Sequence, residues 1–137
     1  MSDFKTEKQI EKDIYRIVSG STLATLLKGK VYRKGMRPQN AKTEDAVVGF
    51  LSGLDDQFQT GVVNVNVYVP FKEAKTQKRP DIGRVDELEA EIRKVFEEDI
   101  EDPYYLLEVP ESPQSDDLDD IEQTQINARI HYKRTTF

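Results

Sequence analysis

The chain has 137 residues, which is a usual size for a single domain with one modest core, so we expect residues 1–137 to form one domain. Its 26 acidic and 20 basic side chains give a formal charge of −6, which argues against general attraction to nucleic acid or to anionic membranes. The sequence contains no cysteine, which excludes disulfides, thiolate nucleophiles and cysteine-based zinc sites.

The first third of the chain predicts helices followed by strands. Residues 6–18 place apolar side chains at i, i+4, i+7 and i+8 among charged ones, which indicates an amphipathic helix lying on a sheet. Ser19-Gly20-Ser21 ends this helix, and a short second helical turn follows it. Residues 30–34 and 46–51 are predicted strands, and a loop containing Pro38 joins them.

The strongest pattern is the alternation in residues 61–71. Valines occupy every second position, so they point to one side of an extended chain and the residues between them point to the other. Residues 121–134 alternate in the same way, and both runs exceed the usual strand of about 5–6 residues. We expect the valine side to form core. The opposite side, with Asn64, Asn66 and Tyr68, is the predicted surface for a neighbouring molecule.

The remaining segments complete the order of elements. Residues 72–80 are predicted to be a polar connection, and Asp81 is the predicted N-cap of a helix that continues to residue 99. Residues 104–109 are a predicted strand, and residues 111–120 a mobile acidic loop. The order α, short α, β, β, β, α, β, β favours an α+β fold: a mostly antiparallel sheet of about five strands with two main helices on one face.

The inventory of chemical groups predicts no catalytic, cofactor or metal site. His131 is the only histidine and lies on the polar side of the last predicted strand, so we interpret it as a surface residue. The paired aspartates at 55–56, 116–117 and 119–120 lack the spacing of a calcium loop, and no glycine-rich phosphate-binding pattern occurs.

The opening residues lack the apolar stretch of a signal peptide, so residence in the cytoplasm is the expectation. Nothing resembles a membrane span.

A group of basic residues occupies the predicted connection 72–80. These side chains either contact an acidic partner or phosphate, or are solvated like most loop charges. The same alternatives hold for Arg33, Lys34 and Arg37. The four bases of the connection are Lys72, Lys75, Lys78 and Arg79.

The order of elements, together with several short passages, resembles the small tail-terminator (tail-completion, minor tail) proteins of long-tailed phages and their prophage relatives. The likeness spans nearly the full chain and includes the long 62–69 strand, the second helix and the closing strand. The passages that carry it are Ile14-Tyr15-Arg16-Ile17-Val18, Leu23-Ala24-Thr25-Leu26-Leu27-Lys28-Gly29-Lys30-Val31-Tyr32, Arg37-Pro38-Gln39-Asn40 and Val47-Val48-Gly49-Phe50.

The resemblance implies a structural, non-enzymatic role without a cofactor. Such proteins form a ring, commonly a hexamer, on the end of the assembled tail tube, where the ring stops tube growth and offers the attachment surface for the filled head. The expected partners are other copies of the chain, the tail-tube protein and the head–tail connector. The expected location is the cytoplasm of the bacterial host during assembly, and then the tail or neck of the virion.

Charge suggests how such a ring would hold together. The bases of residues 72–79 are expected to pair with acids of a neighbouring copy, at residues 97–99 and 116–120.

Two other classes of function stay open: a small module that binds a peptide by strand addition, and an enzyme that collects scattered acids and His131 in a deep pocket. Another neck or head-completion protein is the closest alternative within the phage interpretation. An active phage, a prophage remnant and a related contractile machine are all compatible with this sequence.

Overall fold

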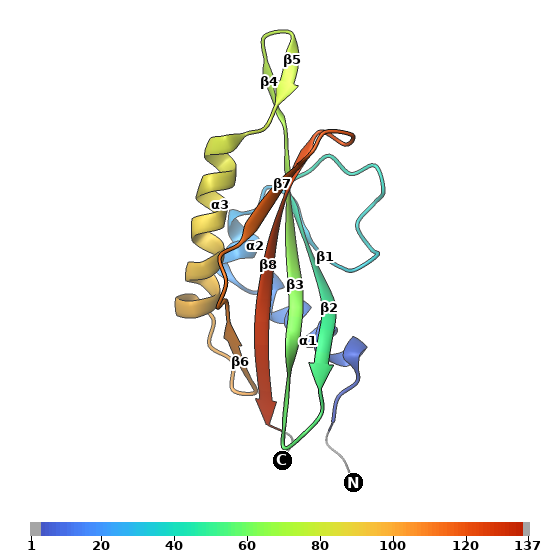
Figure 1. Ribbon diagram of the computed structural model, residues 1–137, viewed down its shortest axis with the longest axis vertical. Helices are drawn as coiled ribbons and strands as arrows, with labels where there is room; N and C mark the ends of the chain where they lie inside the picture. The colour runs from blue at the N-terminus through green and yellow to red at the C-terminus, as the bar shows by residue number, and fades with distance from the viewer. Residues whose placement is uncertain (1–3, 136–137) are drawn as a thin grey trace.

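The computed structural model describes residues 4–135, which form one long, twisted sheet with helices packed against it (Figure 1). The α+β class predicted from the sequence is confirmed. In chain order the elements are α1 (Glu7–Ser19), α2 (Thr22–Leu26), β1 (Val31–Arg33), β2 (Asp45–Leu54), β3 (Phe58–Pro70), β4 (Lys72–Ala74), β5 (Gln77–Arg79), α3 (Ile82–Lys94), the π-helical turn η1 (Val95–Asp99), β6 (Tyr105–Glu108), β7 (Gln114–Leu118) and β8 (Gln123–Thr135).

The two long alternating runs form the centre of the sheet. β3 and β8 pair antiparallel over their whole length, from Phe58 opposite Thr135 to Pro70 opposite Gln123. β2 flanks β3, and the short β1 lies parallel to β2 at that edge. The outer edge of β8 carries two strands, β6 at one end and β7 at the other. The sheet therefore has six strands, one more than the predicted number.

The helices and the valine side of β3 together make the core. Thr6 caps α1 with a capping box, and α1 buries its apolar stripe against β1 and β2. Asp81 caps α3 as predicted, and α3 and η1 bury a second stripe beside β8. Val63, Val65 and Val67 are fully buried beneath these helices. Each such side chain stabilises the fold by roughly 1.5–3 kcal/mol relative to an exposed one.

Two predicted loops are strands instead, and both expectations were wrong. Residues 72–80 form the β4–β5 hairpin, whose turn contains Lys75 at φ 56. Residues 111–120 contain β7, which pairs with residues 123–127 of β8. In both cases, strand pairing satisfies backbone groups that a loop would leave to water, and pairing does not require apolar side chains.

A buried carboxylate joins α1 to an irregularity in β2. The register between β2 and β3 shifts between Phe50 and Ser52, as in a β-bulge, and the N–H of Phe50 donates instead to the carboxylate of Glu11 at 3.1 Å. Glu11 is only 2% exposed and also accepts a hydrogen bond from Arg33 Nε at 3.2 Å. Arg33 is therefore a structural ion-pair partner, which rules out the solvated alternative for this residue.

Candidate interaction surface

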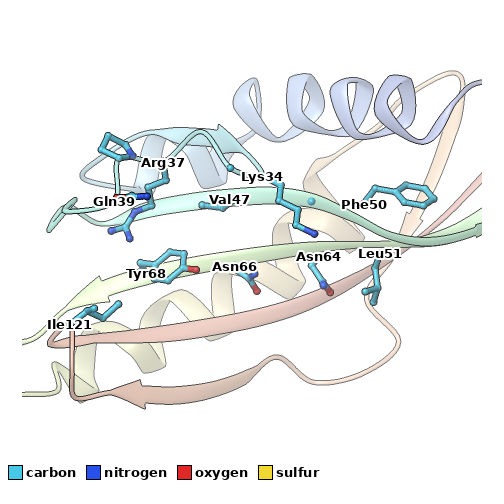
Figure 2. Close-up of a pocket in the computed structure, with 13 residues that line it drawn as sticks. Lys34, Arg37, Gln39, Val47, Phe50, Leu51, Asn64, Asn66, Tyr68 and Ile121 are labelled. Atoms are coloured by element: carbon cyan, nitrogen blue, oxygen red, sulfur yellow. The ribbon is translucent and has the colours of Figure 1, made fainter.

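No helix that the structure describes covers the other side of the sheet, although the loop after β1 borders part of it, and we call this side the open face (Figure 1). The predicted contact residues Asn64, Asn66 and Tyr68 lie on it, because they alternate with the core valines of β3. They form part of the floor of a hollow of about 410 Å³. Figure 2 shows them along β3, with Lys34 and Arg37 from the loop after β1 opposite them.

The hollow has both polar and apolar lining residues, and neighbours already engage the polar part of its floor. The amide of Asn127 on β8 donates to Asn66 Oδ1 at 2.6 Å. Oδ1 of Asn64 is buried without a hydrogen-bond partner among the described residues. The strand register adds two glutamines to these amides, since Gln114 lies opposite Asn127 and Gln125 lies opposite Tyr68. This end of the open face is consequently rich in amides, which offer both donors and acceptors to a partner.

Arg37 holds the loop that borders the hollow. Its guanidinium lies 4.3 Å from the ring centroid of Tyr68 and donates to Asp45 Oδ2 at 3.0 Å and to Gln123 Oε1 at 2.9 Å. It also donates to the carbonyl of Thr43 at 3.0 Å, within its own loop. Arg37 is therefore a positioning residue for the hollow, and it is not a solvated charge.

Asp45 is the buried anion that holds Arg37 in place. Its side chain is 1% exposed and accepts hydrogen bonds from Thr43, Arg37 and the backbone N–H of Lys30. Burial raises the pKa of Asp45, but these hydrogen bonds outweigh burial, so the pKa lies below its ordinary value. The carboxylate thus stays charged at neutral pH and keeps the loop closed onto the sheet.

The other end of the open face carries exposed leucines. Leu54, Thr60, Lys133 and Leu106 lie in one row across four strands. Leu54 is 65% exposed and Leu106 is 56% exposed, and Leu51 near the bulge is 49% exposed. These leucines contribute exposed apolar area to this side of the sheet. No sequence pattern singles out these residues, although the leucines at 51, 54 and 106 fall in or beside predicted strands.

The four predicted bases lie apart from this hollow. Lys72, Lys75, Lys78 and Arg79 are all exposed on the β4–β5 hairpin, which projects from one end of the molecule (Figure 1). Their ion pairs with described carboxylates are long: Lys72 to Asp81 at 4.0 Å, and Lys78 to Glu73 at 4.0 Å within the hairpin. The predicted contact residues therefore form two surfaces, the open face and the hairpin.

His131, Tyr132 and Tyr105 lie on the neighbouring strands β8 and β6. His131 is half-buried on the open face, opposite Val62 and Glu108 in the strand register. Burial raises the pKa of Tyr132 to about 12, and burial together with a hydrogen bond to Asp13 raises the pKa of Tyr105. Neither tyrosine supplies a phenolate near neutral pH. Residues 4–135 contain no group of three or more His, Asp or Glu side chains placed to hold a metal ion.

Two findings bear on identity. Within residues 4–135, no helix combines the length and the apolar character needed to cross a membrane. Comparison of the chain with protein-family models finds no matching family, and comparison with the curated proteins finds no match either.

Proposed function

We propose that this chain is a structural, non-enzymatic tail-completion protein of a phage or prophage. Its copies would form a ring that caps the tail tube and offers the surface for head attachment. The observation that carries the proposal is the open face. β3 and β8, of 13 residues each, form the centre of a long sheet, and the helices pack on only one face of it. A sheet face of this length with leucines and amides on it suits contact with a large assembly.

The composition of the hollow supports a binding role over catalysis. Its polar side chains are amides, a tyrosine and two cations. Catalysis of acyl or proton transfer needs a nucleophile or base within hydrogen-bond reach of an activating group. Arg37 and Tyr68 instead contact each other and hold the loop in place. These contacts shape a surface for a protein partner.

Ring formation by the purified chain tests the proposal. Analytical ultracentrifugation across a wide concentration range, with electron microscopy of the heaviest species, should show a closed ring. The double variant Leu54→Asn/Leu106→Asn should assemble less, because it removes apolar contact area without adding charge. Ile82→Asn is the control, since Ile82 is 67% exposed but lies at the start of α3. A chain that stays monomeric at every concentration would contradict the proposal.

A peptide-binding module is the second candidate, and one observation favours it. β1 pairs with residues 46–48 only, and residues 51–54 of β2 are exposed, which leaves an edge to which a partner strand could add. Such a module would work as a monomer or dimer. A persistent monomer that binds an extended peptide, with amide exchange slowed along residues 51–54, would favour it over the ring.

A further inference from the structure

The β4–β5 hairpin is built as an arm. Its residues are exposed apart from the half-buried Ala74, and no helix or strand other than its own two strands makes extensive contact with it. Figure 1 shows the hairpin extending beyond the end of the sheet. Residues 72–79 contain four bases and one acid, Glu73. A projecting, basic hairpin without packing of its own suggests a partner elsewhere.

Acidic charge is concentrated in the segment that follows the hairpin. Residues 81–118 carry 14 acids and three bases, a net charge of −11, although the whole chain carries only −6. The far end of α3 is the densest part, with five acids in residues 97–102. The carbonyl end of the helix adds partial negative charge there. Glu98 and Glu101 are exposed, and neither forms an ion pair with a described residue.

The hairpin cannot reach this acidic end within the same molecule. The hairpin precedes the start of α3, whereas residues 97–102 begin in η1 at its other end (Figure 1). The 18 residues of α3 and η1 span about 27 Å at 1.5 Å per residue. That separation exceeds the screening length of about 8 Å at physiological salt. A contact between the hairpin bases and residues 97–102 therefore joins two molecules.

We infer that the β4–β5 hairpin of one copy docks on the acidic end of α3 and η1 of a second copy. This inference rests on the proposed ring and names the contact that closes it. Lys75 and Arg79 of one copy approach Glu98 and Glu101 of the next. Because donor and acceptor patches are different surfaces, repeated docking produces a ring when the rotation closes, and reciprocal docking produces a dimer.

Charge reversal on each side, followed by mixing, tests the contact. Lys75→Glu/Arg79→Glu and Glu98→Lys/Glu101→Lys should each weaken self-association at low salt by roughly tenfold. An equimolar mixture of the two variants should restore assembly, because each reversed patch then meets an opposite charge. Lys12→Glu/Arg16→Glu is the matched control: both residues are exposed on α1, and the charge change equals that of the hairpin variant.

The outcomes separate this contact from the ring itself. Restoration on mixing, with an unaffected control, supports the inference. If the wild-type chain assembles but both reversed variants assemble equally well, or if mixing restores nothing, the hairpin contact is wrong while the proposed ring stands. If the wild-type chain is monomeric throughout, both fail. All substituted positions are exposed, and Lys75 at φ 56 is replaced by another unbranched residue, so urea unfolding should show wild-type stability.

Discussion

Three buried carboxylates, Glu11, Glu44 and Asp45, each meet an arginine from a different part of the chain. Glu44 is 4% exposed and accepts two hydrogen bonds from Arg84, at 2.9 and 2.7 Å. The second of these arginine nitrogens also donates to the carbonyl of Leu26 at 2.7 Å. Arg84 thereby joins the start of α3 to α2 and to the start of β2. Such pairs fix geometry more than they add stability, but breaking one leaves a buried charge.

Asp45→Asn tests the most buried of these anions. Because its pKa is lower in the folded protein, Asp45 contributes stability that is fully present above its unfolded pKa of about 3.9 and is lost as pH falls from there through the folded pKa. The variant should lose about 3 kcal/mol at neutral pH. Urea unfolding between about pH 2 and 7 should show the two free energies of unfolding converging in acid.

Asp86→Asn is the control for that experiment, since Asp86 is exposed on α3. It should change the unfolding free energy by less than about 0.5 kcal/mol at any pH. A constant gap between wild type and Asp45→Asn across the acid range would show that the charge of Asp45 is not what stabilises the loop.

Two glycines allow a matched test of packing between β2, β3 and β8. A Cβ on Gly61 would lie 2.2 Å from the carbonyl oxygen of Ser52 and 2.7 Å from the ring of Tyr132, whereas a Cβ on Gly83 would meet nothing within 4 Å. Gly61→Ala should therefore destabilise by about 3 kcal/mol. Gly83→Ala, within α3, should stabilise by about 0.5 kcal/mol. Thermal unfolding of both variants checks these values, and equal effects would disprove the close approach at Gly61.

At the scale of elements, the hairpin can be separated from the fold. Lys72 and Arg79 are paired in register, so their Cα atoms lie about 5 Å apart and an Asn-Gly turn can replace residues 72–79. The hydrogen bond from the Phe71 N–H to the carbonyl of Glu122 stays in place. The shortening removes the pairing of β4 with β5 and the ion pairs at the exposed Lys72 and Lys78, so the free energy of unfolding should change by less than about 1 kcal/mol.

Sedimentation of this shortened chain then reports the hairpin's role. Self-association should fall to the level of the charge-reversed hairpin variant. A large loss of stability on urea unfolding would instead show that the hairpin supports the sheet.

At the scale of the whole molecule, the separation of charge predicts salt-sensitive assembly. Raising sodium chloride from about 50 to 500 mM shortens the screening length from about 14 to 4 Å. Self-association of the wild-type chain should weaken several-fold over this range, measured by sedimentation velocity. Association that strengthens with salt would indicate that the leucines of the open face dominate, since salt does not screen apolar contacts.

Several features of the molecule follow from the sequence alone. The alternation in β3 and β8 and the stripes of α1 and α3 are local periodicities, and periodicity determines which side of each element is buried. The valine core was therefore predictable, and the sequence also indicated Asp81 as the cap of α3. The alternation also placed Asn64, Asn66 and Tyr68 on one side of the sheet.

Only the tertiary structure decided where strands pair and which charges meet. β7 is a run of polar and acidic residues whose strand conformation depends on the free edge of β8, and local propensity does not report such an edge. Arg37 reaches Gln123, 86 positions away in the chain, so no sequence spacing reveals the contact. Likewise, the open face is free of helices because the described helices all pack on the other side of the sheet (Figure 1). Pairing and ion contacts between distant segments are properties of the folded arrangement, whereas periodicity is a property of each segment.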